Sequence, residues 1–208
     1  MKFYIDFDST LYNTTLFTQS LLDAIAKNII SQNQSLSFEN ILDEEKELFV
    51  SDKIYNIEKF CKFFAEKYNL NFDSIFSSAK SVIENGTIFI YEDTIPFLEK
   101  LKKTDNELII LTYAQKGNTD EQMQKIKGSG LDKYFDDIII TIVPKWTLEL
   151  DYENGFFIDD NPKELSGLFK NNPLKIVRIR RENNKYSSRP LADGIKIDEY
   201  KNLTDVIY

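Results

Sequence analysis

The sequence predicts an α/β protein: a three-layer sandwich whose central parallel sheet is covered on both faces, with an α-helical insertion after the first strand. Two patterns indicate it. From Tyr12 to about Phe89 the apolar residues recur at the spacing of amphipathic helices, and no strong strand interrupts them. After Tyr91, strand-length apolar runs alternate with helical segments, which is typical of a parallel sheet with crossover helices.

The first strand and the helices of the insertion follow from residue type and spacing. The aromatic and β-branched run Phe3–Ile5 predicts a buried strand. The first helix repeats an apolar residue at every fourth position, with Asn13 or Thr14 as its N-cap: Phe17, Leu21, Ile25 and Ile29. The helices expected in this block are Asn13–Ile30, Ile54–Tyr68 and Asp73–Ile83, the last closed by Gly86.

The second half of the chain alternates between helices and strands. The expected helices are Thr94–Lys103, Thr119–Lys127, Pro162–Phe169 and Leu203–Ile207. The expected strands are Glu107–Leu111, one within Phe135–Val143, Phe156–Ile158, Lys175–Arg180 and Gly194–Ile197. Together with the first strand they predict a core of residues 1–11 and 90–208, and an inserted helical domain of residues 12–89.

Composition excludes several classes of function. The 208 residues carry 26 basic and 34 acidic side chains, a net charge of −8, so we expect neither nucleic acid nor an anionic membrane as a partner. There is no histidine and one cysteine, Cys61. The absence of histidine excludes Ser-His-Asp and Cys-His catalysis and His-ligated zinc. A single cysteine excludes an intramolecular disulfide. Chemistry must therefore come from carboxylates, lysine, hydroxyls or a bound ion.

The apolar runs are also too short for a membrane span. The longest, near Ile138–Val143 and Leu108–Leu111, have the length of strands. Asp6 and Asp8 interrupt the N-terminal run before it reaches the length of a signal peptide. We expect a cytoplasmic protein, and the sequence leaves its oligomeric state open.

Polar residues follow four of the predicted strands. They are Asp6, Asp8 and Thr10 after the first strand, Thr112 and Lys145 after the next two, and Asp159 and Asp160 after the fourth. Each has an ordinary explanation, since Asp159 or Asp160 is a suitable N-cap before Pro162 and most lysines are solvated. Such explanations do not account for the whole set at the carboxyl ends of the strands. In parallel sheets the ligand crevice lies at this edge.

This set resembles the haloacid dehalogenase (HAD) superfamily of phosphohydrolases, whose pattern is Asp-x-Asp-x-Thr, then Thr or Ser, then Lys, then an acidic pair. The matching residues are Asp6, Asp8, Thr10, Thr112, Lys145, Asp159 and Asp160. Residues 130–136 also look like the segment that precedes the lysine in many capped members. The resemblance spans the chain, and it makes residues 12–89 a helical cap domain on a Rossmann-like HAD core.

The resemblance implies a role for each motif residue. Asp6 is the nucleophile that forms an aspartyl-phosphate, and Asp8 protonates the leaving alcohol and then activates water. Thr112 and Lys145 bind the substrate phosphate, and Lys145 balances charge. Mg²⁺ is the implied cofactor. Its ligands are the Asp6 side chain, the Asp8 backbone carbonyl and Asp159, with Asp160 bound directly or through water. Lys116 and Lys127 are rival candidates for the lysine.

Position 8 narrows the reaction class. Within the superfamily that the chain resembles, dehalogenases lack the second aspartate and ion-pumping ATPases carry threonine, so Asp8 favours a phosphatase or a phosphomutase. Ser9 stands where one common variant has glycine, which disfavours a sugar phosphomutase. We expect a Mg²⁺-dependent phosphatase acting on a small phosphorylated metabolite. The alternatives are a phosphomutase and a catalytically silent binding or regulatory protein.

Two further features have competing interpretations. Residues 170–189 carry seven basic side chains and one acidic one. A solvated basic edge is the favoured interpretation of this run, and the alternative is that Arg180 or Arg181 grips an anionic substrate. Aromatic residues gather in the predicted cap and are expected in its core, although some are candidates for lining a pocket: Phe60, Phe63, Phe64 and Tyr68.

Overall fold

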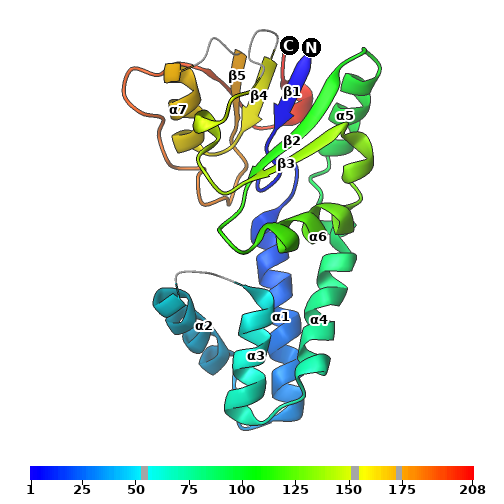
Figure 1. The fold of residues 1–208 in the computed structure, drawn as a ribbon, viewed down its shortest axis with the longest axis vertical. Helices are drawn as coiled ribbons and strands as arrows, with labels where there is room; N and C mark the ends of the chain where they lie inside the picture. The colour runs from blue at the N-terminus through cyan, green and yellow to red at the C-terminus, as the bar shows by residue number, and fades with distance from the viewer. Residues whose placement is uncertain (53–55, 151–154, 172–174) are drawn as a thin grey trace.

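The computed structural model describes residues 1–52, 56–150, 155–171 and 175–208. In these residues six parallel strands form one sheet in the order β3-β2-β1-β4-β5-β6 (Figure 1). The strands are β1 (Lys2–Ile5), β2 (Glu107–Tyr113), β3 (Asp137–Thr141), β4 (Gly155–Asp159), β5 (Lys175–Ile179) and β6 (Asp198–Tyr200). The predicted α/β class with a parallel sheet is confirmed.

The alternation of side chains along β1 produces the three layers. Phe3 and Ile5 point to one face, where they pack in a cluster with α5 (Thr94–Lys102) and α6 (Thr119–Ser129). Tyr4 points to the opposite face, where it packs in a second cluster with α7 (Pro162–Asn171). Because successive residues of a strand face opposite sides, one apolar run serves both clusters.

Four helices lie between β1 and α5 in the described part of the chain: α1 (Thr14–Gln32), α2 (Phe38–Asp52), α3 (Ile57–Tyr68) and α4 (Phe72–Glu84). They form a block beyond one end of the sheet (Figure 1), and a 3₁₀ turn, η1 (Gly86–Phe89), leads back to it. One buried apolar cluster extends from β1 into this helical block. Phe60 and Phe64 belong to it, as expected. The domain boundaries at 11/12 and 89/90 remain a prediction.

The helix ends test the local predictions. Asn13 is the N-cap of α1, since its side chain accepts a hydrogen bond from the Leu16 N–H at 3.0 Å. The predicted start of α3, Ile54, lies outside the described residues. Gly86 does not close α4 in a left-handed conformation, because Asn85 is the C-cap.

Gly86 is required instead by close packing against α6. A Cβ atom there would lie 2.9 Å from the backbone carbon of Gly128 on α6. A Cβ at Gly128 would in turn lie 1.9 Å from the carbonyl oxygen of Ile83. The two glycines therefore let the helical block approach the core backbone to backbone.

The C-terminal predictions are wrong in detail. The expected strand Gly194–Ile197 is a turn and loop, because Gly194 has a φ of 80° and Ile197 packs against the α7 side of the sheet. The strand is β6, which pairs only with β5. The expected helix Leu203–Ile207 is reduced to one 3₁₀ turn, η4 (Leu203–Asp205).

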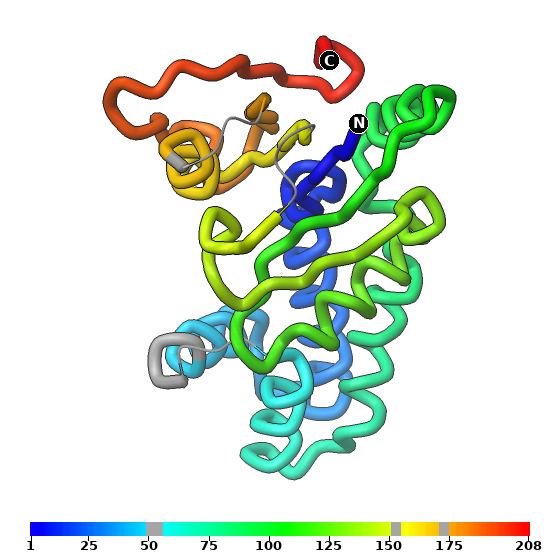
Figure 2. The backbone as a smooth tube through the Cα atoms, turned by 45° about the horizontal axis from the view of Figure 1, so that its top comes forward, coloured from blue at the N-terminus to red at the C-terminus, as the bar shows by residue number. Residues whose placement is uncertain are grey.

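Both ends of the chain lie side by side at the end of the sheet away from the helical block (Figures 1 and 2). The ring of Tyr208 meets that of Phe3 edge to face, with 5.4 Å between centroids. Among the described residues, no helix has the length and apolar character needed to cross a membrane.

Candidate active site

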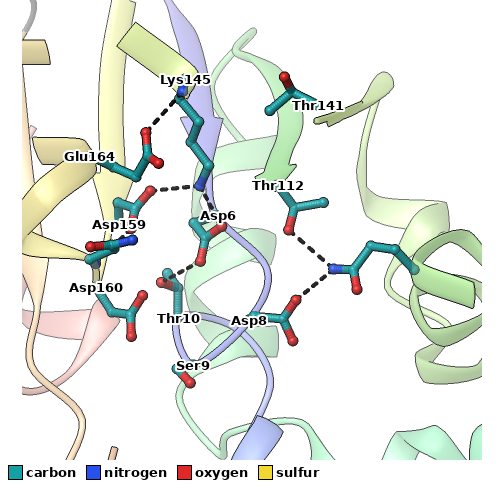
Figure 3. A network of polar contacts seen from close by, with 12 residues as sticks. Asp6, Asp8, Ser9, Thr10, Thr112, Thr141, Lys145, Asp159, Asp160 and Glu164 are labelled. Carbon is teal, nitrogen blue, oxygen red and sulfur yellow. Dashed lines mark hydrogen bonds and ion pairs between the residues drawn. The ribbon is translucent and has the colours of Figure 1, made fainter. Parts of the chain in front are cut away.

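The strand order brings the predicted site residues to one edge of the sheet. The order reverses at β1, whose neighbours are β2 and β4, and such a reversal opens a crevice at the carboxyl ends of the strands. Asp6 directly follows β1. Thr112 is the second-last residue of β2, and Asp159 is the last residue of β4. Figure 3 shows these side chains converging with Lys145.

Lys145 bridges two of the aspartates. Its Nζ donates to Asp6 Oδ1 at 2.5 Å and to Asp159 Oδ2 at 2.6 Å, and the side chain is 2% exposed. Burial alone would lower the pKa of Lys145, but the charges of Asp159 and Asp6 outweigh it and raise the pKa. The lysine begins a 3₁₀ turn, η3 (Lys145–Thr147), and its backbone N–H donates to Glu164 of α7 at 2.9 Å. The rival Lys116 and Lys127 are exposed.

Three buried carboxylates form a possible metal site. Asp6, Asp159 and Asp160 each offer an oxygen, and these oxygens lie within 4.8 Å of one another. Burial raises the pKa of Asp6 well above its usual range, against the pull of Lys145, and Asp159 and Asp160 add to the rise. Burial and Asp159 likewise raise the pKa of Asp160 to about 7. One lysine therefore leaves the cluster short of positive charge.

Asp8 lies apart from this cluster and faces α6. Its carboxylate accepts hydrogen bonds from Thr14 Oγ1 at 2.5 Å, Gln122 Nε2 at 2.6 Å and Lys125 Nζ at 2.5 Å. Burial acts to raise the pKa of Asp8, but Lys125 and these hydrogen bonds outweigh it, so the pKa is lowered. The carboxylate is not part of the three-acid cluster. Metal binding through the Asp8 backbone carbonyl remains a prediction.

No family model matches the sequence, and no curated protein matches it. Several solved structures, however, have a similar fold, and each of the three named next aligns with 98% of this chain. YfnB from Bacillus subtilis, described as a HAD-hydrolase bound to magnesium, is 14% identical over 95% of its own chain, with a TM-score of 0.58. A HAD phosphatase from Thermococcus onnurineus is 21% identical over 95%, with a TM-score of 0.61. A 2-haloacid dehalogenase from Pseudomonas syringae is 16% identical over 94%, with a TM-score of 0.64.

This chain has the HAD fold. The resemblance expected from Asp6, Thr112, Lys145 and Asp159 is thus confirmed at the level of fold. A phosphatase and a dehalogenase both stand among the similar structures. The HAD fold by itself therefore does not specify the reaction, which depends on the residues at the site.

The turn after β1 separates the two aspartates of the first predicted motif. Ser9 lies between them with a φ of 60°, a left-handed conformation that non-glycine residues seldom adopt. Its N–H donates to the Tyr12 carbonyl at 2.8 Å, and Thr10 Oγ1 donates to Asp6 Oδ2 at 3.3 Å. The turn directs Asp6 toward Lys145 and Asp8 toward α6 (Figure 3).

The sequence reasoning missed three residues that hold Asp8: Thr14, Gln122 and Lys125. Gln122 also donates to Thr112 Oγ1 at 3.1 Å, so it joins the first two motifs. A signal was present, because Gln122 and Lys125 are three residues apart and share one face of the predicted helix. Only the packing of α6 under the sheet edge shows that this face meets Asp8.

Two arginines of the basic run serve the structure of the core, whereas its other five basic side chains are exposed, as the solvated-edge interpretation expects. Arg178 and Arg181 are 1% and 6% exposed, so the solvated-edge interpretation is wrong for both. Arg181 donates to both carboxylate oxygens of Asp93, at 2.7 and 2.8 Å, and to the Thr10 carbonyl at 2.8 Å. Neither it nor Arg180 lines the pocket at the HAD motifs. Arg181 therefore stabilises the turn after β1 by linking the Thr10 carbonyl to Asp93.

A pocket of about 850 Å³ joins the predicted site residues at the sheet edge to the helical block. Asp6, Asp8, Thr112 and Lys145 line it from the sheet edge, and side chains of α1 and α2 line it from the opposite side. This volume lies in the range of pockets that enclose a small molecule.

Proposed function

We propose that this protein is a Mg²⁺-dependent phosphatase that hydrolyses a small phosphorylated metabolite through a phosphorylated Asp6. The observation that carries the proposal is the division of labour between the two aspartates after β1. Asp6 lies in the lysine-bridged acidic cluster, and Asp8 lies outside it, held by three donors at the same pocket. Two carboxylates that lie apart at one pocket can take separate roles, one as the nucleophile and one in proton transfer.

The donor set fits a divalent cation. Three buried carboxylates lie close together and one ammonium compensates them only in part, which suits a hard cation with oxygen ligands. Asp6, Asp159 and Asp160 would hold the ion, with the Asp8 carbonyl as the further expected ligand. Bound Mg²⁺ would supply positive charge that lets a phosphate dianion approach a carboxylate.

The residues around Asp6 suit a nucleophile. Lys145 and Thr10 hold its two oxygens from different sides, which fixes the carboxylate at the floor of the pocket. In the first step a carboxylate oxygen of Asp6 bonds to phosphorus while the bond from phosphorus to the ester oxygen breaks. Lys145 balances the negative charge of the transferring group. Thr112 Oγ1 accepts from Gln122, so its own O–H is the group suited to donate to a phosphate oxygen.

Asp8 supplies the proton transfers. A proton on Asp8 would pass to the ester oxygen as that oxygen leaves as an alcohol, and the partners that lower the pKa of Asp8 favour giving this proton up. The resulting carboxylate then takes a proton from the water that attacks phosphorus, which releases phosphate and restores Asp6. Lys125, Gln122 and Thr14 stabilise that carboxylate between the two steps. A dehalogenase has no alcohol to protonate, so Asp8 favours the phosphatase.

The test is phosphate release from an aryl phosphate with Mg²⁺ and with excess EDTA. We expect release that needs Mg²⁺, that is lost in Asp6→Asn, and that is unchanged in Asp193→Asn, an exposed aspartate outside the pocket. Full activity in excess EDTA would contradict the proposal. Phosphate transfer between hydroxyls without net release would favour the phosphomutase, and halide release from a 2-haloacid would favour a dehalogenase.

A further inference from the structure

The side of the pocket opposite the phosphate site has an apolar wall. We use this name for six residues of the helical block that line the pocket: Phe17, Leu21, Leu22, Phe38, Leu42 and Ile57. Phe17 and Leu21 are one turn apart on α1, and Phe38 and Leu42 are one turn apart on α2. Residues at this spacing share a helix face, so Phe17 and Leu21 lie on one face of α1, and Phe38 and Leu42 lie on one face of α2.

Polar residues of α1 also line the pocket, and several of them are exposed. Thr15, Thr18 and Gln19 are exposed, whereas Phe17 and Leu21 are buried. The pocket is therefore lined by polar side chains of α1 as well as by the apolar wall, and the acidic cluster forms its floor at the sheet edge. A bound molecule must place its phosphate on the floor and the rest of its surface against apolar side chains.

The charges of the pocket accommodate one anionic group. Among the described residues that line it, seven are acidic and three are basic. Lys125 and Lys145 are already paired with aspartates, and Lys185 is exposed, its Nζ 4.7 Å from the centre of the Tyr186 ring. No described residue of the helical block brings a cation to the pocket. A second phosphate or a carboxylate on the ligand would therefore face acidic side chains at the sheet edge and apolar ones on the wall. Lys185 is the lining cation that forms no ion pair with the described residues.

We propose that the substrate is a monophosphate ester whose organic part is uncharged and apolar, an alkyl or aryl group seated against the apolar wall. This inference rests on the proposed phosphatase function, which it narrows to a substrate class. Polyol phosphates, sugar phosphates and nucleoside polyphosphates fit poorly, because their hydroxyls or extra charges would lose water at the wall without gaining partners.

The first experiment measures kcat/KM for ethyl, butyl and hexyl phosphate with Mg²⁺. These alcohols are leaving groups of nearly equal basicity, so chain length changes the buried apolar surface and little else. We expect kcat/KM to rise by about fourfold per methylene group until the wall is covered. Propyl phosphate should also exceed glycerol 1-phosphate, which has the same carbon chain with hydroxyls. A flat series, or preference for the glycerol ester, would overturn the inference.

A binding experiment separates this inference from the proposed reaction. Ethyl-, butyl- and hexylphosphonate cannot be hydrolysed, and calorimetry in Mg²⁺ gives their dissociation constants. Affinity that rises with chain length supports the role of the apolar wall, whether or not any ester is hydrolysed. If affinity rises but no ester is hydrolysed, only the proposed phosphatase function is contradicted. Hydrolysis of esters with no dependence on chain length, in rates or in binding, would remove only the substrate class.

A pair of variants tests the wall directly. Phe38 is 38% exposed, so Phe38→Ala combined with Leu42→Ala removes apolar surface from α2 with little loss of buried core. The double variant should lose most of the chain-length dependence of kcat/KM, so that its values for hexyl and ethyl phosphate lie closer together than in the parent. Ile88→Ala, which removes an exposed apolar side chain outside this pocket, is the control. An unchanged slope in a double variant with the parent circular dichroism spectrum would contradict the assignment.

Discussion

Replacing Lys145 by methionine removes the charge at the centre of the site and leaves the length of the side chain nearly unchanged. The ammonium lies 2.5 Å from an Asp6 oxygen and 2.6 Å from an Asp159 oxygen, and all three side chains are at most 7% exposed. Lys145→Met therefore leaves two buried carboxylates close together without their shared cation.

The size of the effect follows from these distances. With an effective dielectric constant of about 20, each contact contributes roughly 6 kcal/mol of Coulomb attraction, most of which offsets the cost of taking the charges out of water. Removing one partner of a buried pair costs about 3–5 kcal/mol net. Whole-domain stabilities are about 5–15 kcal/mol, so we expect a folded protein whose Tm is lower by roughly 10 °C.

Trp146, the single tryptophan, adjoins the substituted residue and reports unfolding by fluorescence. Urea titrations of the parent, Lys145→Met and the exposed-lysine control Lys116→Met should show the loss in Lys145→Met alone. Mg²⁺ should restore more stability to Lys145→Met than to the parent, because the orphaned carboxylates gain a cation. Phosphatase turnover should fall by about 10²–10³-fold.

Two results would refute this reasoning. An unfolding free energy within about 1 kcal/mol of the parent would mean that the lysine does not compensate the buried aspartates. Near-normal turnover in Lys145→Met, beside a crippled Lys116→Met or Lys127→Met, would assign the charge-balancing role to another lysine.

Three further predictions follow from the contacts. In rapid-quench assays with a labelled aryl phosphate, Asp6→Asn should form no phosphoenzyme, whereas Asp8→Asn should accumulate it as a burst before slow turnover; a phosphoenzyme in Asp6→Asn would contradict the nucleophile assignment. Arg181→Lys should lower the Tm by several degrees and leave KM near the parent value, with Arg180→Ala as the exposed control; a raised KM at unchanged Tm would indicate substrate contact. A backbone N–H and a lysine hold the pKa of Asp136 below its ordinary value. Asp136→Asn should therefore be less stable than the parent at pH 7, and the difference should vanish in thermal melts as the pH falls below 4; a constant difference would argue against it.

The strands that carry the site were predictable because their signal is local. Runs such as Phe3–Ile5 and Phe156–Ile158 are buried on both faces, so burial requires apolar residues at every position. Where burial is partial the prediction failed. At the sheet edge β6 pairs on one side only, and its residues Asp198–Tyr200 carry no apolar run. The apolar Ile195 and Ile197 just before it suggested the wrong segment.

The sequence by itself determined the residue types that meet at the site, because parallel strands bring their carboxyl ends to one edge wherever the chain goes in between. Only the tertiary structure decided how those residues divide their work. The packing of α6 and α1 gives Asp8 the partners Lys125, Gln122 and Thr14, and the placement of α1 and α2 makes the pocket apolar opposite the phosphate site. Both depend on contacts between segments distant in sequence. The spacing of apolar residues places them on a helix face, but it does not specify what that face meets.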